Sequence, residues 1–246
     1  MSHSTATYIL AVLIICSSSA FGQGPRSDTL AHHNAILLTK KIYQSIIGGN
    51  ATVFNGIEYI NPLQKKTLNG NACFLTDEWQ EGFLFYDDQL YEQVSLQYNL
   101  FLNKVIIEHI QSHASIELIN DKIKYFGIGN HIFVRLSALP GQSEIKEGFY
   151  DVLADGDTKV YVRRYKTIKE VADQKIMVTE FLDKTRLFLF KDEQYTAITN
   201  KHSALNAFGK NKPELKKFLA QEKINFRSNP EIAMIALASH YDELNK

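Results

Sequence analysis

The sequence predicts a mainly β fold (α+β): an antiparallel meander forming a curved sheet or an open barrel, with an N-terminal helix and C-terminal helices packed on it. Between Gly56 and Thr199, about eleven short segments alternate apolar and polar residues with a period of two, separated by polar turns. Helical spacing of apolar residues occurs only near the two ends, so there is little room for the crossover helices of a parallel sheet.

Composition and charge indicate a globular domain and argue against nucleic-acid binding. The 246 residues include 27 Lys+Arg and 27 Asp+Glu, so the chain has no net charge to attract nucleic acid or an anionic membrane over long range. We therefore expect no nucleic-acid partner. Hydrophobic residues make up 45% and charged residues 22%, which is typical of a globular domain with one core.

Residues 1–22 have the pattern of a signal peptide. The apolar run Tyr8–Cys16 is shorter than the ~20 residues of a membrane-spanning helix, and Ala20 and Gly22 are small residues suited to a cleavage site before Gln23. The run lacks a preceding Lys or Arg, and the alternative is an N-terminal buried helix or strand. We expect export to the periplasm or extracellular space, leaving 23–246 as a single β-rich domain, with 201–246 its helical part and no transmembrane span.

The mature domain begins with a predicted helix from Ser27 or Asp28 to about Ile47, although short strands also fit this stretch. Extended segments follow at Gly56–Pro62 and Ala72–Thr76. The second contains Cys73, the one cysteine that remains after signal removal, so we expect no internal disulfide.

The central block, Glu81–Ile110, predicts three antiparallel strands joined by turns at Asp87–Gln89 and Asn103–Lys104. In the middle strand, period-two alternation places Leu90, Val94, Leu96 and Tyr98 on the dry face. The same alternation places Tyr91, Gln93, Ser95, Gln97 and Asn99 on the wet face.

The meander continues to about Thr199. Its predicted strands are Ser115–Ile119, Lys122–Ile128, His131–Ser137, Gly148–Leu153, Lys159–Tyr165, Lys175–Leu182, Arg186–Phe190 and Tyr195–Thr199, with a turn at Asp183–Thr185 between the sixth and seventh. Three helices follow. They comprise a turn at Ser203–Phe208, a helix capped by Asn211, and a last helix that starts at a capping-box pattern, Ser228–Glu231.

No residue pattern indicates catalysis, a metal site or a cofactor. His109 and His113 are four residues apart at a strand end, without the glutamate that follows the first histidine in helical zinc proteases. The carboxylate pairs Asp87–Asp88 and Asp155–Asp157 lie in predicted turns, where Asp is common for backbone reasons. We interpret Cys73 as a core residue, and glycine-rich phosphate loops and nucleophile elbows are missing from the sequence.

One basic cluster is interleaved with tyrosines in the strand that starts at Lys159. It comprises Lys159, Arg163, Arg164, Lys166 and Lys169, together with Tyr161 and Tyr165. It is consistent with contact to an anionic polymer or with a solvated strand face whose charges discourage edge pairing. The candidate ligand-binding residues are Tyr161 and Tyr165 of this cluster, together with Tyr91 on the predicted wet face of the central strand.

Several segments resemble a recurrent set of uncharacterised exported β-rich proteins of Bacteroidota. They are Asn55–Tyr59, Gly82–Asp87 with Tyr91 and Val94, Leu96–Tyr98, Gly148–Tyr150 with Leu153 and Gly156, and the tail Leu215–Tyr241. These motifs are turns and aromatic strand positions. The resemblance therefore implies a shared fold and export, and no catalytic residue follows from it.

Together these observations lead us to expect an exported, non-enzymatic protein that binds an apolar ligand in the cell envelope. The alternative is a scaffold that binds another envelope protein through a strand edge or its tyrosine-rich face. A third hypothesis, an enzyme acting on glycans or peptides, requires two carboxylates that meet in a cleft.

Overall fold

The computed structural model describes residues 52–63, 67–137, 144–173 and 176–246, all within the compact unit Gly48–Lys246. The predicted signal peptide and the predicted helix ending near Ile47 lie outside these residues. The strands are β1 (Ile57–Glu58), β2 (Thr67–Asn69), β3 (Gln80–Tyr86), β4 (Gln89–Asn99), β5 (Lys104–Glu108), β6 (Ser115–Glu117), β7 (Ile123–Ile128), β8 (His131–Leu136), β9 (Gly148–Asp155), β10 (Lys159–Asp173), β11 (Ile176–Lys191) and β12 (Gln194–Ile198).

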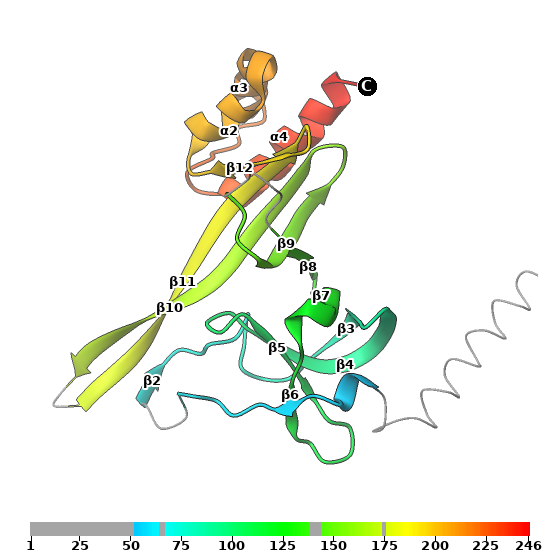
Figure 1. Ribbon diagram of the computed structural model, residues 1–246. Coiled ribbons are helices and arrows are strands. Elements are labelled where there is room, and N and C mark those ends of the chain that lie inside the picture. Colours follow the sequence, from blue (N-terminus) through cyan, green and yellow to red (C-terminus); the bar gives the residue numbers. More distant parts are fainter. Residues whose placement is uncertain (1–51, 64–66, 138–143, 174–175) are drawn as a thin grey trace, which may run out of the picture. The chain divides into compact units, whose positions relative to one another are not determined.

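The described strands form one curved sheet that does not close, as Figure 1 shows. Its order is β1-β6-β5-β4-β3-β7-β8-β9-β10-β11-β12, antiparallel at every step, and β2 adds a short parallel ladder to β11. Three-residue 3-10 turns are η2 (Thr52–Phe54), η3 (Asn120–Lys122) and η4 (Gly209–Asn211), and the α-helices are α2 (Lys201–Ala207), α3 (Lys212–Gln221) and α4 (Pro230–Leu244). The predicted antiparallel β fold with C-terminal helices is confirmed.

The faces of the central strand differ from the prediction, because β4 contains a bulge. Gly82 pairs with Val94 and Phe83 pairs with Glu92, so Gln93, at φ +57°, is an extra residue between the two pairs. The extra residue reverses the alternation, because each one-residue shift moves side chains to the other face. Tyr91 is therefore buried and Leu90 is exposed, the opposite of the prediction.

The second correction concerns β11, which runs without interruption through the predicted turn at Asp183–Thr185. The long partner strand β10 holds this segment in register, with Lys166 opposite Asp183 and Arg164 opposite Thr185. The Nζ of Lys166 lies 3.5 Å from a carboxylate oxygen of Asp183. Cross-strand pairing thus overrides local turn propensity.

The predicted strand Ala72–Thr76 is also wrong. Cys73 forms a single isolated bridge with Asn99, and Leu75 has a φ of +62° that strand geometry does not allow. The segment nevertheless contributes to the core, because Phe74 packs edge-on against Phe133 at a centroid distance of 5.0 Å.

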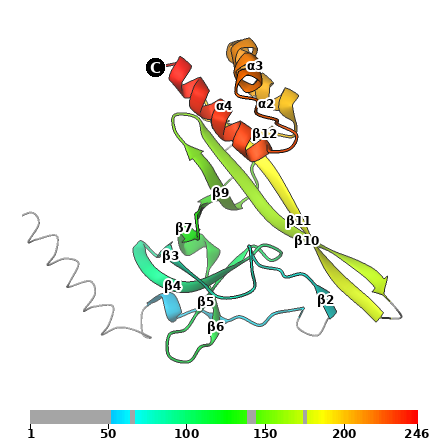
Figure 2. The same cartoon turned by 180° about the vertical axis from the view of Figure 1, so that it is seen from behind.

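The apolar core has three clusters. The first fills the interior of the sheet from β3 to β9 with aromatic rings, and Tyr98, Phe126 and Phe133 pack there at centroid distances of 5.0–5.2 Å. The second lies between β9–β12 and the three α-helices, which cover one face of these strands in both views (Figures 1 and 2). The third lies on the other face of the same strands and includes Tyr161 and Phe188.

The helical tail begins with a true capping box. The Asn200 side chain accepts a hydrogen bond from the Ser203 N–H, and the Ser203 hydroxyl oxygen accepts one from the Asn200 N–H. Asn211 occupies the N-cap position of α3, as predicted, but its side chain forms no capping hydrogen bond. The predicted capping box of the last helix is absent, because Asn229 is the N-cap without a side-chain hydrogen bond and Glu231 pairs elsewhere.

Candidate functional site

The three tyrosines singled out in the sequence do not form one site. Tyr91 is 7% exposed and belongs to the first cluster, whereas Tyr161 belongs to the third. Burial raises the pKa of Tyr161 to about 12, and the neighbouring Tyr195 adds to this shift. Tyr165 is half-buried, with the guanidinium of Arg163 6.0 Å from its ring centroid. Core packing and intramolecular contacts account for all three.

The predicted basic cluster on β10 is largely neutralised within the protein. Lys159 pairs with Asp155, and Lys166 pairs with Asp183. Arg164 forms ion pairs with two carboxylates. The strand therefore does not present five free cations to an anionic polymer.

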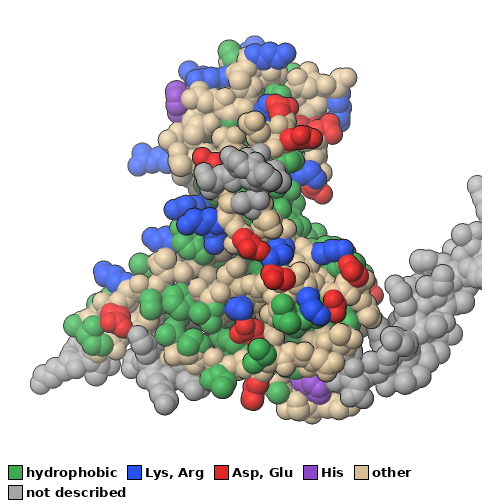
Figure 3. Space-filling view, viewed as in Figure 1, with side chains coloured by type: hydrophobic (Ala, Val, Ile, Leu, Met, Phe, Trp, Pro, Cys, Tyr) green, Lys and Arg blue, Asp and Glu red, His purple; other side chains and the backbone are tan. Residues whose placement is uncertain are grey.

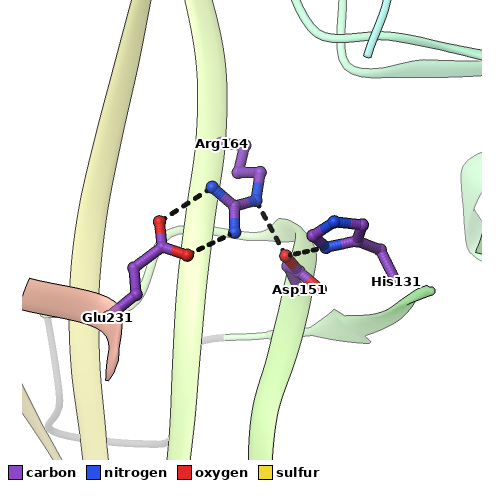
Figure 4. A network of polar contacts seen from close by, with 4 residues as sticks. All are labelled: His131, Asp151, Arg164 and Glu231. Carbon is purple, nitrogen blue, oxygen red and sulfur yellow. Dashed lines mark hydrogen bonds and ion pairs between the residues drawn. The ribbon is translucent and has the colours of Figure 1, made fainter. Parts of the chain in front are cut away.

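Arg164 lies at the centre of a polar network with His131, Asp151 and Glu231 (Figure 4). Its Nε donates to Oδ2 of Asp151 on β9 at 2.8 Å, and its two terminal nitrogens donate to Glu231 of α4 at 2.9 and 2.8 Å. The Nδ1–H of His131 on β8 donates to the same Oδ2 of Asp151 at 2.7 Å. Asp151 is 1% exposed, so its charge depends on these two donors.

This network connects side chains of β8, β9 and β10 with α4. Burial lowers the pKa of Arg164, but hydrogen bonds to Glu231 and Asp151 outweigh it, so the net pKa is raised and the guanidinium stays charged. Among the described residues, Asp151 is the one hydrogen-bond partner of the His131 ring, so no hydroxyl or thiol nucleophile is bonded to it. Three strands and α4 are thereby held together.

The remaining candidate residues from the sequence, Cys73, Asp87 and Asp88, have structural contacts in the fold. Burial, and secondly the charge of Asp77, raise the pKa of Cys73 to about 11, which disfavours the reactive thiolate. Asp87 and Asp88 form the two-residue turn between β3 and β4 and pair with Lys122 of η3 and Lys124 of β7. In the described part of the chain, no group of three His, Cys, Asp or Glu side chains is placed to hold a metal ion.

A groove of about 740 Å³ opens between the start of α2 and the end of α3, and we call it the helical groove. Its lining consists of Thr199, Asn200, Lys201, Leu219, Ala220, Lys223, Ile224, Asn225, Phe226, Arg227 and Pro230. The floor is continuous with the second core cluster, because Leu219 and Phe226 belong to both. Lys201, Lys223 and Arg227 are exposed at the walls, and none of them forms an ion pair with a described residue.

These three cations were missed in the sequence, although a signal was present. Residues 201–227 contain seven Lys or Arg and two Asp or Glu, a net charge of 7 − 2 = +5. The neutral whole-chain charge conceals this excess, because the other residues hold 20 Lys+Arg against 25 Asp+Glu. A charge count by segment, rather than over the chain, would have identified it.

A second, shallower groove of about 470 Å³ lies on the outer face of β3, β4 and β7, and we call it the aromatic groove. It is lined by Glu81, Gly82, Phe83, Leu90, Glu92, Gln93 and Tyr125. The Phe83 ring lies against the backbone of Gly127, where a Cβ would approach its Cε1 to 2.3 Å. Two carboxylates, Glu81 and Glu92, thus line one groove, and both are exposed.

Comparison with known proteins gives no match to a family model, to a curated protein or to a solved structure. The assignment of a function therefore depends on the geometry of this chain. Within the described ranges, no helix has the length and apolar character needed to cross a membrane.

Proposed function

We propose that this protein is an exported, non-enzymatic binding protein of the cell envelope and that it holds an amphiphilic anion in the helical groove. The observation that supports this best is the composition of that groove: an apolar floor, three exposed cations at the walls and no carboxylate in the lining. Its volume of about 740 Å³ falls within the range of small-molecule sites. The ligand class is an acyl chain or similar apolar body with a negatively charged head.

The interior of the curved sheet offers less support for a ligand. Its first cluster is filled with the protein's own aromatic side chains, and Phe126 stacks on Phe133 at 5.0 Å. In the helical groove, by contrast, Ile224 and Pro230 are only partly buried, so they retain apolar surface for contact. Each methylene buried there would contribute about 0.8 kcal/mol.

Displacement of a fluorescent long-chain fatty acid from the purified protein tests this proposal. Ala220→Trp, which fills the groove from an exposed position of α3, is expected to abolish binding. The double substitution Lys223→Asn and Arg227→Gln removes two exposed charges and is expected to weaken binding by about 5- to 30-fold, taking about 0.5–1 kcal/mol for each exposed ion pair. Asparagine is chosen because Lys223 has a φ of +55°.

Two controls make the result interpretable. Lys184→Gln lies on β11 outside the groove and should leave the affinity unchanged. A long-chain alcohol of equal length should bind more weakly than the acid, because it lacks the charge that Lys201, Lys223 and Arg227 would contact. Equal binding of acid and alcohol, or full binding by Ala220→Trp, would contradict the proposal.

The aromatic groove supports a second candidate function, a protein-interaction module. Its rings and Leu90, which is 37% exposed, give an apolar surface on the outer face of the sheet. A photoreactive residue at position 90 should form a specific protein adduct in native envelopes, whereas the same residue at position 186 should not. Lipid adducts alone at position 90 would refute this second candidate.

A further inference from the structure

A local excess of positive charge lies around the helical groove. The side chains Lys201, Lys210, Lys212, Lys216, Lys217, Lys223 and Arg227 define a region that we call the basic face. In Figure 3, lysine and arginine side chains gather over α2 and α3. Glu214 and Glu222 are the two acidic residues in this stretch of sequence.

The basic face differs from the sheet in how its cations are partnered. Among the described residues of the sheet and its turns, eight lysines and arginines form ion pairs, whereas four on β10 and β11 form none: the paired ones are Lys104, Lys122, Lys124, Arg135, Lys159, Arg164, Lys166 and Lys191, and the others are Arg163, Lys169, Lys184 and Arg186. None of the seven cations of the basic face has an ion pair with a described residue, and Lys212 bonds only the amide oxygen of Asn206. Seven unpaired cations repel one another and favour an external anionic partner.

Two lysines of the basic face lie on the side of α3 that leads to the helical groove. On α3, Lys212, Lys216 and Ala220 recur every four residues and therefore lie along one side of the helix. Ala220 lines the helical groove, and Lys223, two residues beyond the end of α3, lies on the groove wall. A planar anionic partner that contacts these lysines would thus lie next to the groove opening.

We infer that the basic face docks on a bilayer surface that contains anionic phospholipids, with the helical groove beside the lipid headgroups. Clusters of four to eight Lys or Arg are the pattern that binds such surfaces. The choice of a membrane over an acidic protein rests on the proposed function, because an amphiphilic anion enters and leaves its carrier at a lipid surface. The neutral whole chain makes this docking a local contact, sensitive to salt over about 8–10 Å.

Co-sedimentation of the purified protein with phosphatidylcholine vesicles, with and without phosphatidylglycerol, tests the inference. Binding is expected only with phosphatidylglycerol and should decrease as salt is added. The double substitution Lys216→Gln and Lys217→Gln should lower the partition coefficient by about 25-fold, since each lysine contributes about fivefold near an anionic surface. Both residues are exposed and lie outside the groove lining, so the fatty-acid affinity should be unchanged.

The matched control is Lys184→Gln with Arg186→Gln, which removes two exposed cations from β11 and should alter partitioning less than twofold. Equal binding to both kinds of vesicle, or an equal loss in the control, would overturn the inference. So would tight binding of a polyglutamate peptide that phosphatidylglycerol vesicles do not compete away, because it would identify an acidic protein as the partner.

Failure of docking and failure of the proposed function give different results. Ala220→Trp should lose the fatty acid but still bind phosphatidylglycerol vesicles, because it leaves all seven cations in place. A protein that binds fatty acid in solution but no anionic vesicle would disprove docking alone. One that binds vesicles but no fatty acid would disprove the proposed function alone.

Discussion

Replacing Arg164 with methionine should destabilise the protein far more than removal of an exposed arginine. The Arg164 side chain is 14% exposed, and its loss leaves the carboxylate of Asp151 in the core with His131 as its one remaining donor. Breaking a buried ion pair by removing one partner costs about 3–5 kcal/mol. For a domain of this size, that loss corresponds to a decrease in Tm of about 6–20 °C.

Urea unfolding followed by circular dichroism and by the fluorescence of Trp79, the single tryptophan, measures the change. Arg186→Met, on the exposed part of β11, is the matched control and should change the free energy of unfolding by no more than about 0.5 kcal/mol. Asp151→Asn combined with Arg164→Met should recover part of the loss, because the double variant has no buried charge left unpaired. A cost below about 1 kcal/mol for Arg164→Met would refute the reasoning, since water would then be solvating Asp151.

Three further predictions follow from burial and close approach. At pH 8, the native Cys73 thiol should react with a disulfide reagent about 100-fold more slowly than in the unfolded protein, because its pKa is raised to about 11; a rapid native reaction would refute its burial. Since Tyr161 has a folded pKa of about 12 against 10 when unfolded, its contribution to stability is complete below pH 10 and is lost as pH rises to 12. Tyr161→Phe should therefore flatten the alkaline limb of the curve of unfolding free energy against pH, and an unchanged limb would contradict the assignment. Gly82→Ala should destabilise more than Gly156→Ala, because the new Cβ meets the backbone oxygen of Gly127 at 2.0 Å at the first position and the end of the Asp242 side chain at the second; thermal unfolding would show the opposite order if the sheet adjusts at β7.

Local patterns predicted the strands well where the turn chemistry is local. Asp87 and Asp88 have φ values of 51° and 62° and form a two-residue hairpin turn, as their position between two alternating segments indicates. The predicted starts of β9 and β10, at Gly148 and Lys159, match the structure. These turns and strand starts depend on residues that are neighbours in the sequence, so they can be predicted from the sequence alone.

The errors arose where distant residues decide the structure. Gln93 is the extra residue of a bulge that only the partner strand reveals, and it reversed the predicted exposure of Tyr91. Glu231 fits a capping box, but Arg164, 67 residues away, pairs with its carboxylate instead. A charge count by segment would have indicated the cations of the helical groove, but not the groove itself, because the start of α2, the end of α3 and residues 223–230 line it together only in the folded chain.

The order of strands in the sheet also sets how much chain separates each pair of neighbouring strands. Most neighbours in the sheet are neighbours in the sequence, and their short loops close at low entropic cost. The exceptions are β1–β6, β3–β7 and β2–β11, and the longest separation is that of β2, where Thr67 pairs with Val178 across more than a hundred residues of chain. In a chain that emerges from its N-terminus, β2 therefore waits longest between its own synthesis and that of its partner strand, and its backbone donors and acceptors stay unpaired over that interval.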